Sequence, residues 1–413
     1  MSDLCLVLNC GSSSIKFALV PRPAGADPAA WPVVDRQSVR ASGQVSRIGQ
    51  ESASFRWHDQ PARPLEVRGQ AAYHDALAHI LDEVDRRLAQ EGAWRGAGGG
   101  MPRLAVVAHR VVHGGGHHHM PLKLDGASLA ELKALIPLAP LHQPFALEAV
   151  ELMLASHPGL PQVACFDTAF HHDLPMEERM LPLNWSAWQR GIRRYGFHGL
   201  SYDYIAQRLK GLAEPHAAGR VIVAHLGSGA SLCAMREGRS VATTMGFSAL
   251  DGLMMGSRCG SVDPGALLYL IEQEQLSVPE LGRMLYHDSG LAGLSGRSGD
   301  MAELLVAEGG DERVQAALAL YVRRIVRELG ALVAVLGGLD LLVFTAGVGE
   351  HAAPIRARVA QALGFLGLQL DEGANTRHAE VISAPGSRVT VRVEPTCEEE
   401  VAARQAWGVV ISA

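Results

Sequence analysis

The sequence predicts an α/β fold made of two duplicated lobes, and two observations carry this prediction. Apolar strands alternate with segments of helical periodicity, and the strands end in polar or glycine-rich residues. In addition, a strand, turn and strand pattern from Asn9 to Lys16 returns in a weaker form from His225 to Ser231. In both copies a glycine and small hydroxyl residues follow the first strand, so the turn presents backbone N–H groups to an anion. We therefore expect two phosphate-facing hairpins, although either copy taken alone also fits an ordinary β-hairpin.

The expected strands follow in chain order from the distribution of apolar residues. They span residues 4–8, 104–108, 162–166, 221–224 and 340–344. They lead into Asn9, into His109 and Arg110, into Asp167, into His225, and into the Thr345–Glu350 segment. Ligands of α/β proteins collect at the carboxyl ends of such strands, so these residues are the first candidates for a site.

Between the strands the sequence indicates an amphipathic helix and several breaks. Apolar residues recur at helical spacing from Leu77 to Leu88. Residues 21–32 are rich in proline and alanine and predict a loop, and the glycines of 96–100 predict a break before the next strand. The apolar stretch 331–344 is short and contains Asp340, so we interpret it as a buried helix end and strand, not as a membrane span.

Length and composition set the expected organisation. A chain of 413 residues is longer than one hydrophobic core usually serves, so we expect two domains, 1–170 plus 401–413 and 171–400. The net charge of -6 argues against nucleic acid and anionic membranes as partners. The six cysteines have no regular spacing and no signal peptide is visible, which is typical of reduced thiols in a cytoplasmic protein.

Motif patterns narrow the kind of nucleotide site. No G-x-x-x-x-G-K-[ST] P-loop occurs in the sequence, and no G-x-G-x-x-G opens a helix after the first strand. Duplicated hairpin lobes with a glycine-rich segment near the end instead resemble the superfamily of actin, hexokinase and the heat-shock chaperones, which has a ribonuclease H-like fold. This resemblance implies a nucleotide and substrate cleft between the two lobes.

Nine sequence blocks, in order along the whole chain, resemble the acetate kinase family. They are NCGSSSIKF from Asn9, AHRVVHGG from Ala108, PLAPLH from Pro137, FDTAFH from Phe166, RRYGFHG from Arg193, HLGSGAS from His225, GLMMGSRCG from Gly252, FTAGVGE from Phe344 and PTCEEE from Pro395. The resemblance implies reversible phosphoryl transfer between ATP and acetate, giving acetyl phosphate and ADP by direct in-line attack, with Mg²⁺ or Mn²⁺ as the metal. It also implies a homodimer.

Arg110 and Arg258 are the cations expected to bind the reacting anions. A transferring phosphoryl group spreads negative charge over its equatorial oxygens while an anionic carboxylate approaches it, and guanidinium groups suit such charges. Arg258 stands between Gly256 and Gly260, which leave room for a ligand. The alternative interpretation is that both arginines form surface salt bridges.

The resemblance also assigns the residues that contact ATP. It gives His198 the role of hydrogen bonding the transferring phosphoryl group, whereas an isolated histidine of this kind is usually a core residue. It places the adenosine at the glycine-rich segment, which we expect to be a loop ahead of a helix that starts near Pro354. The implied ATP-binding residues are Ser12, Ser14, Lys16, His225, Gly227, Ser228, Gly229, Asp300, Gly347, Val348, Gly349, Glu350 and His351.

Asp167, Glu398 and Asn9 resemble the metal-orienting set of the family, with Asp167 also among its catalytic residues. Mg²⁺ needs few carboxylates because waters and phosphate oxygens complete its coordination. No general base is required, since acetate is already ionised at neutral pH. Without the resemblance, Glu398 is better interpreted as a solvated acid in the first turn of a helix.

Val112, Leu141 and Phe197 match the apolar acyl pocket of the family. Where the family often has a proline, this chain has Ala249, and a smaller wall there admits a longer acid. Propionate or butyrate is therefore an alternative substrate. His142 also matches a position near the site.

Other departures from the family pattern leave the nucleotide preference open. Ser228 and His351 each replace an asparagine, and Ala302 replaces an arginine. The histidine run 117–119 predicts an exposed loop in preference to a metal site, because consecutive histidines rarely converge on one ion. An alternative from another functional class is a non-catalytic nucleotide switch of the actin or chaperone type, which has no use for the two arginines or for an acyl pocket.

Overall fold

The computed structural model describes residues 3–25, 31, 34–69, 71–90 and 103–412. Contacts divide the chain into two units, one of Met1–Ala169 with Cys397–Ala413 and one of Phe170–Thr396. The last helix, α15 (Glu398–Ser412), therefore belongs entirely to the first unit, whereas the expected boundary at 401 lies inside it. Part of the expected loop 21–32, and the glycines of 96–100, fall outside the described residues.

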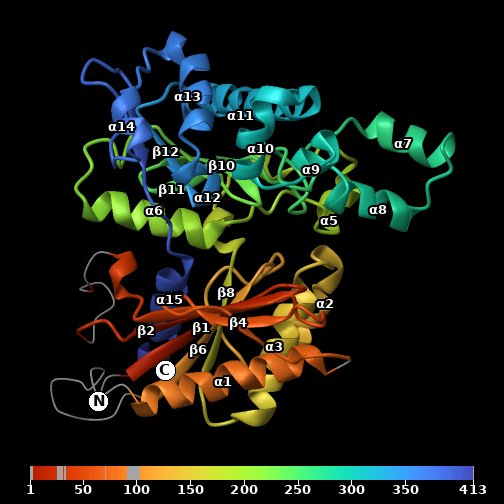
Figure 1. Ribbon diagram of the computed structural model, residues 1–413, viewed down its shortest axis with the longest axis vertical. Coiled ribbons are helices and arrows are strands. Elements are labelled where there is room, and N and C mark those ends of the chain that lie inside the picture. The colour runs from red at the N-terminus through yellow and green to blue at the C-terminus, as the bar shows by residue number, and fades with distance from the viewer. Residues whose placement is uncertain (1–2, 26–30, 32–33, 70, 91–102, 413) are drawn as a thin grey trace. The chain divides into compact units, whose positions relative to one another are not determined.

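The first unit is built on a mixed sheet with the strand order β5-β4-β3-β2-β1-β6-β8-β7 (Figure 1). Its strands are β1 (Asp3–Cys10), β2 (Ser14–Pro21), β3 (Ala41–Ser46), β4 (Ser54–Trp57), β5 (Arg63–Pro64), β6 (Arg103–Val111), β7 (Leu122–Lys123) and β8 (Gln162–Phe166). Its α-helices are α1 (Ala72–Gln90), α2 (Gly126–Ala134), α3 (Gln143–Ser156) and α15. The expected helix at 77–88 and the strand at 162–166 are confirmed.

The second unit has a five-stranded sheet with the order β11-β10-β9-β12-β13. Its strands are β9 (Val221–Leu226), β10 (Ala230–Arg236), β11 (Arg239–Thr243), β12 (Leu341–Thr345) and β13 (Thr390–Val393). Its α-helices are α4 (Met176–Arg179), α5 (Trp185–Gln189), α6 (Gly199–Gly211), α7 (Pro264–Glu272), α8 (Val278–His287), α9 (Gly290–Ser295), α10 (Met301–Ala307), α11 (Glu312–Leu336), α12 (Ala346–His351), α13 (Ala353–Ala362) and α14 (Glu372–Thr376).

The two sheets share one topology. In the first, β1 pairs antiparallel with β2, β2 antiparallel with β3, β1 parallel with β6, and β6 parallel with β8. In the second, β9, β10, β11, β12 and β13 repeat these pairings in the same order. The duplicated α/β fold predicted from the hairpin repeat is thus confirmed.

Alternation along β1 explains how helices cover both faces of the first sheet. Leu4, Leu6 and Leu8 point into a core shared with α1 and α3, because successive side chains of a strand face opposite sides. The other face is covered by α15, which contacts β1, β6 and β8, and the Sγ of Cys165 donates to the carbonyl oxygen of Ala402 at 3.5 Å. This packing brings the first residue of α15 to the carboxyl ends of the central strands. Among the described residues, no helix is both long and apolar enough to cross a membrane.

Candidate active site

A cation between two carboxylates lies at the carboxyl edge of the first sheet. Arg110 is near the end of β6, Asp167 directly follows the neighbouring parallel strand β8, and Glu398 is the first residue of α15. The guanidinium of Arg110 donates from Nε to Asp167 Oδ1 at 2.9 Å and from Nη2 to Oδ2 at 2.7 Å. Its third nitrogen, Nη1, lies 2.8 Å from Glu398 Oε2. The three side chains that the sequence picked out one by one therefore form one cluster.

Burial sets the electrostatics of this cluster. The Asp167 side chain is 3% exposed and that of Glu398 16%. Burial works against the charged guanidinium, but Asp167 and Glu398 outweigh it and hold the pKa of Arg110 above its usual value. Burial, with repulsion from Asp167, raises the pKa of Glu398 to about 7, against the attraction of Arg110. Two carboxylates thus share one cation, and negative charge is in excess.

This excess of negative charge fits a magnesium site. Both carboxylates contact the same guanidinium, so a divalent cation placed beside them would offset their repulsion. Among the described residues, no three His, Cys, Asp or Glu side chains are grouped to hold a metal by themselves. A site with two carboxylates suits Mg²⁺, which keeps waters and phosphate oxygens in its coordination sphere. Asn9, the third expected residue, lies on β1 opposite Lys16 of β2.

In metal-free protein, Glu398→Gln will weaken the dependence of stability on pH. In the wild type the carboxyl holds its proton up to about pH 7 when folded but only up to about pH 4.5 when unfolded, so the stability of the folded state falls as pH rises through this interval. Urea unfolding in the presence of a chelator, at pH 5.5 and pH 8, measures the difference. Glu66→Gln, at an exposed glutamate of the same unit, is the control. A variant whose stability changes with pH as much as that of the wild type would contradict this assignment.

The two expected hairpins differ in length. In the first, Cys10 pairs with Ile15, and the backbone N–H of Gly11 donates to the carbonyl oxygen of Ser14 at 2.8 Å. In the second, Leu226 pairs with Ala230, and Gly227 donates to Gly229 at 3.0 Å, so this turn is one residue shorter. The two hairpins therefore correspond up to Gly11 and Gly227, and differ in length after these glycines. Ser12 in the first turn, Lys16 on the strand that follows it and Ser228 in the second turn are exposed, and Ser14 is half-buried.

His198 lies at the start of α6 and its ring is oriented by two hydroxyl groups. Its backbone is left-handed, with a φ of 60°, and its Nδ1 lies 2.8 Å from Ser231 Oγ. The buried phenol of Tyr202 also bonds this oxygen. Either hydroxyl of this pair can be the donor; when the phenol donates to Ser231, Ser231 donates to Nδ1 and the proton of a neutral His198 is on Nε2. The sequence analysis did not pick out Ser231 or Tyr202, because nothing local marks them as partners of the histidine.

A second imidazole stacks on His198. The rings of His198 and His225 are 4.2 Å apart and inclined by 18°. His225 Nδ1 lies 2.8 Å from Ser201 Oγ, and Ser201 donates to Thr396 at 2.9 Å. Ser201 therefore accepts from Nδ1 of His225, which places the proton of a neutral His225 on Nδ1.

Arg258 lies in a loop that contacts the second hairpin, where the backbone N–H of Gly256 donates to the carbonyl oxygen of Ser228 at 3.4 Å. A Cβ placed on Gly229 would lie 3.1 Å from His198 Nε2 and 3.8 Å from Arg258 Nη1, so both donors border the same glycine. Arg258 Nη1 also donates to the carbonyl oxygen of Ala249 at 3.0 Å. Burial lowers the pKa of Arg258. His198, Arg258 and the second hairpin, which were identified separately in the sequence, thus lie close together in the second unit.

The loop that carries Arg258 is held by glycines and by another arginine. A Cβ on Gly260, whose φ is 72°, would lie 2.5 Å from the carbonyl oxygen of Leu253, so only glycine allows this turn. Arg194 donates from Nη1 to the carbonyl oxygens of Thr243, at 3.0 Å, and Met245, at 2.9 Å, just ahead of the loop. Arg194 belongs to the RRYGFHG block, but the carbonyl groups that it binds lie about fifty residues further along the chain, so the sequence does not reveal these contacts.

The glycine-rich segment after β12 is not a loop, contrary to the expectation. It forms α12, while the helix expected near Pro354 is confirmed as α13. The turn into α12 is made by Ala346, whose φ of 63° is unusual for a residue other than glycine. Gly349 then packs so closely on the sheet that a Cβ would lie 3.3 Å from the carbonyl carbon of Phe344. Tertiary packing thus outweighs the low helix propensity of the two glycines.

Arg356, which the sequence analysis did not pick out, holds the end of α12. It is fully buried, and its Nη1 donates to the carbonyl oxygens of Gly349 and Glu350, both at 2.8 Å. Its Nε donates to Asn375 Oδ1 at 2.8 Å, and burial lowers its pKa to about 10. These bonds satisfy carbonyl groups that a helix end leaves without partners.

The other residues expected to contact the nucleotide range from buried to exposed. Asp300 caps α10, since its Oδ1 accepts from the backbone N–H groups of Ala302 and Glu303 at 2.9 and 3.1 Å. Glu350 is buried and accepts from the backbone of Thr396 at 3.4 Å, whereas the side chain of His351 is 76% exposed. Gly347 is exposed, Val348 half-buried, and Ala302 follows Asp300 on the exposed face of α10.

The expected acyl-pocket residues are distributed over both units. Val112 follows β6 and is half-buried, and Leu141, which is 37% exposed, precedes His142 at the start of α3. Phe197 is 1% exposed and belongs to the second unit. The histidine run 117–119 lies in a loop, where His118 Nε2 is 3.2 Å from Glu131 Oε2, as an ordinary surface pair.

Comparisons with known proteins agree over the length of the chain. A model of the acetokinase family matches residues 4–404. The acetate kinase of Rhodopseudomonas palustris is 45% identical over 412 residues, covering 98% of both chains, and that of Rickettsia typhi is 42% identical over 409 residues, covering 98% of this chain and 99% of the other. Among solved structures, a propionate kinase from Francisella tularensis superposes with a TM-score of 0.85 at 33% identity, and the acetate kinase of Porphyromonas gingivalis with 0.83 at 34%. Each covers 99% of this chain and 100% of its own.

Proposed function

The chain belongs to the acetokinase family, and from this premise we propose that it transfers the terminal phosphoryl group of ATP reversibly to acetate, giving acetyl phosphate and ADP. The observation that carries the proposal is the pair of donors beside Gly229, Nε2 of His198 and Nη1 of Arg258. A non-catalytic nucleotide switch needs the hairpins but has no use for a desolvated guanidinium at this place. A kinase needs such donors, because the equatorial oxygens gain partners there as the phosphoryl group transfers.

In this proposal the residues divide the work of binding acetate, the transferring phosphoryl group and the rest of ATP. Acetate attacks in line and needs no base, because its carboxyl group is ionised at neutral pH. His198 and Arg258 donate to the transferring phosphoryl group, and Arg258 and Arg110 suit the carboxylate and phosphate charges. The backbone N–H groups and hydroxyls of the two hairpins bind the ATP phosphates, with Lys16 adding a charge to the first one only. Asp300 and the α12 residues from Gly347 to His351 contact the nucleoside.

We further propose that Asp167, Glu398 and Asn9 hold Mg²⁺, with Mn²⁺ as a substitute. The ion would supply positive charge to the bound phosphates. The residues of this chain orient that charge: Arg110 keeps both carboxylates in place, and Glu398 must lose its proton before it can act as a ligand. All six cysteines are free thiols, which supports the cytoplasm as the location.

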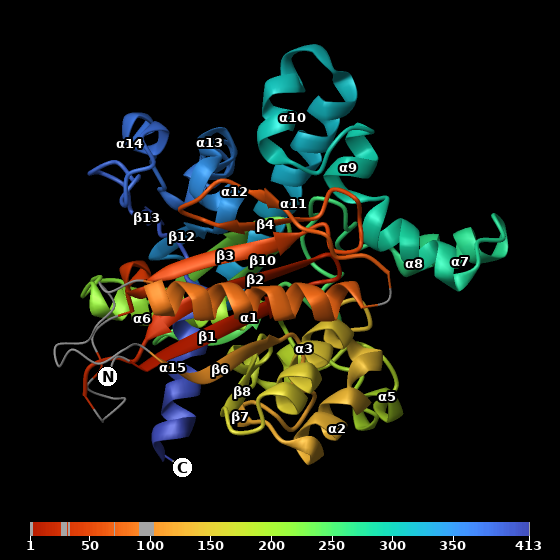
Figure 2. The same cartoon turned by 60° about the horizontal axis from the view of Figure 1, so that its bottom comes forward.

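A homodimer is also part of the proposal. Helix α7 contains no buried residue, although it carries Leu268 and Tyr269, whose side chains are 57% and 58% exposed. Figure 2 shows α7 and α8 as an arm that extends away from α9, α10 and α11 of its own unit. An apolar helix left uncovered in this way is typical of a surface that packs on another chain.

Trapping of acyl phosphates with hydroxylamine tests both the reaction and the acid. With ATP and Mg²⁺ we expect hydroxamate from acetate, and less from propionate and butyrate at equal concentration. If no acid gives hydroxamate, the kinase proposal fails. If propionate is preferred, the alternative within the family replaces acetate.

Ala249→Val will raise the preference for acetate over propionate by about 10-fold in kcat/KM, because the added methyl groups fill space beside Arg258 that the longer acid needs. Steady-state kinetics with both acids give this ratio. Ala249→Ser, of nearly unchanged size, is the control and should keep the wild-type ratio. An unchanged ratio in Ala249→Val would show that residue 249 does not line the acyl pocket.

A further inference from the structure

The first unit contains a pocket of about 500 Å³ at the edge of its sheet opposite to Arg110. It is lined by the first residues of β6, by Asp3 at the start of β1, and by Trp407 and Val410 in the second half of α15. Arg110 lies seven positions further along β6 than Arg103, which is about 23 Å along a strand. The pocket is thus separate from the cluster of Arg110, Asp167 and Glu398, although β6 and α15 contribute residues to both.

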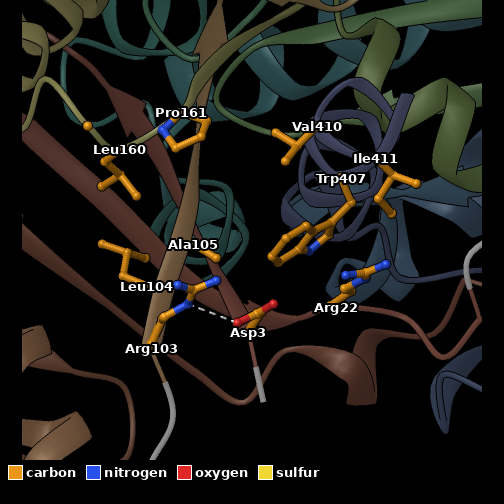
Figure 3. Close-up of a pocket in the computed structure, with 11 residues that line it drawn as sticks. Asp3, Arg22, Arg103, Leu104, Ala105, Leu160, Pro161, Trp407, Val410 and Ile411 are labelled. Carbon is orange, nitrogen blue, oxygen red and sulfur yellow. Dashed lines mark hydrogen bonds and ion pairs between the residues drawn. The ribbon is translucent and has the colours of Figure 1, made fainter. Parts of the chain in front are cut away.

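Polar and apolar groups lie on different sides of this pocket. Figure 3 shows Arg103, Asp3 and Arg22 along one margin and Leu160, Pro161 and Val410 along the other. Arg103 Nε lies 3.2 Å from Asp3 Oδ1, which neutralises one arginine. Within the described part of the chain, no carboxylate is within ion-pair distance of Arg22. The lining therefore carries one uncompensated positive charge beside an apolar wall.

Trp407 adds an unused hydrogen-bond donor to the wall. Its side chain is 2% exposed, and its Nε1 has no hydrogen-bond partner among the described residues. Buried donors nearly always have an acceptor, so one that lacks it in a pocket wall indicates a missing partner. Together with Arg22, the indole also lines a smaller neighbouring cavity of about 80 Å³. The indole ring therefore lies between two cavities, and Arg22 lines both of them.

We propose that this pocket binds an amphipathic anion, with its carboxylate or phosphate head at Arg22 and its apolar body against Trp407, Leu160 and Val410. Arg22 is exposed at the margin of the pocket, where it offers an anionic head group a charged donor that an uncharged molecule would not use, and a small polar anion would make no contact with the apolar wall. The volume falls within the range of small-molecule sites. The proposal does not depend on the reaction that the protein catalyses.

Isothermal titration of the full-length protein with octanoate and with octyl phosphate tests this proposal, with 1-octanol as the uncharged probe. Acetate and MgADP are kept saturating, so that the probes do not occupy the reaction site. We expect one site for at least one anionic probe, and the stronger of the two identifies the head group. No binding of either anion at millimolar concentration, or equal binding of 1-octanol, would overturn the proposal.

Variants then locate the site. Arg22→Ala combined with Arg103→Ala should weaken binding about 10-fold or more, as expected for the loss of charged hydrogen-bond donors. Trp407→Phe retains an aromatic ring but removes the indole N–H, and should weaken binding of the anionic probe several-fold. Arg68→Ala, at an exposed arginine of the same unit outside the pocket, should change nothing. All variants should keep the wild-type rate of hydroxamate formation, and unchanged binding in the double variant would place the probe elsewhere.

Discussion

Arg258→Ala will reduce acyl phosphate formation by about 10³-fold or more while the protein still binds ADP. The guanidinium lies beside His198 at Gly229, where charge develops only as the phosphoryl group transfers. Removing it should therefore lower kcat far more than it weakens nucleotide binding. The hydroxamate assay and titration with MgADP measure the two effects separately.

Two further variants sharpen this test. Arg258→Lys keeps a charge but not the planar fork, so it should recover only a small part of the activity. Arg283→Ala removes an arginine of the same unit whose side chain is 76% exposed, and should leave activity unchanged. Loss of ADP binding in Arg258→Ala, with no acyl phosphate detected in the wild type, would favour the nucleotide switch.

Asp167→Asn will lower activity by about 10²-fold or more and will also destabilise the protein. Asp167 accepts two hydrogen bonds from Arg110 in a buried site, and the amide of asparagine cannot repeat this arrangement. Of the two carboxylates that contact Arg110, this change removes Asp167 and leaves Glu398. Breaking a buried ion pair costs about 3 kcal/mol or more, which urea unfolding will measure together with the loss of activity.

The matched control is Asp59→Asn. Asp59 also receives two hydrogen bonds from one arginine, Arg87, at 3.1 and 2.6 Å, but its side chain is 58% exposed. Exposed pairs contribute about 1 kcal/mol or less, so this variant should remain active and nearly as stable as the wild type. Equal losses in the two variants would show that burial does not set the importance of Asp167.

The architecture was predictable because it depends on patterns that lie close together in the sequence. The Asn9 and His225 turns revealed the duplication, and Asp167 could be placed at a strand end because it directly follows the apolar run from Val163 to Phe166. The segment from Ala346 to His351 was wrongly expected to be a loop, since its glycines disfavour helix and the groups that hold it lie elsewhere. Arg356 of α13 donates to the carbonyl oxygen of Gly349 and is itself held by Asn375 of α14, and no local sequence pattern predicts such contacts.

The candidate site was predictable to a similar extent. Family-like motifs pointed to His198 and Arg258, but not to the orientation of their side chains. The Ser231 and Tyr202 hydroxyls fix the ring of His198, and both stand in the sequence as ordinary core residues. The resemblance identified which groups react, whereas the contacts that orient them required coordinates.

The position of α15 has a consequence for synthesis of the chain on the ribosome. The first unit contains residues up to Ala169 but is completed only by Cys397–Ala413, so a nascent chain that ends earlier leaves one face of its sheet uncovered. The strands of the first unit therefore remain without α15 until the second unit, Phe170–Thr396, has been synthesised. The same delay withholds Glu398, the first residue of that helix. A newly made chain therefore gains the cover of this sheet face and the Glu398 carboxylate together, once α15 packs on the first unit.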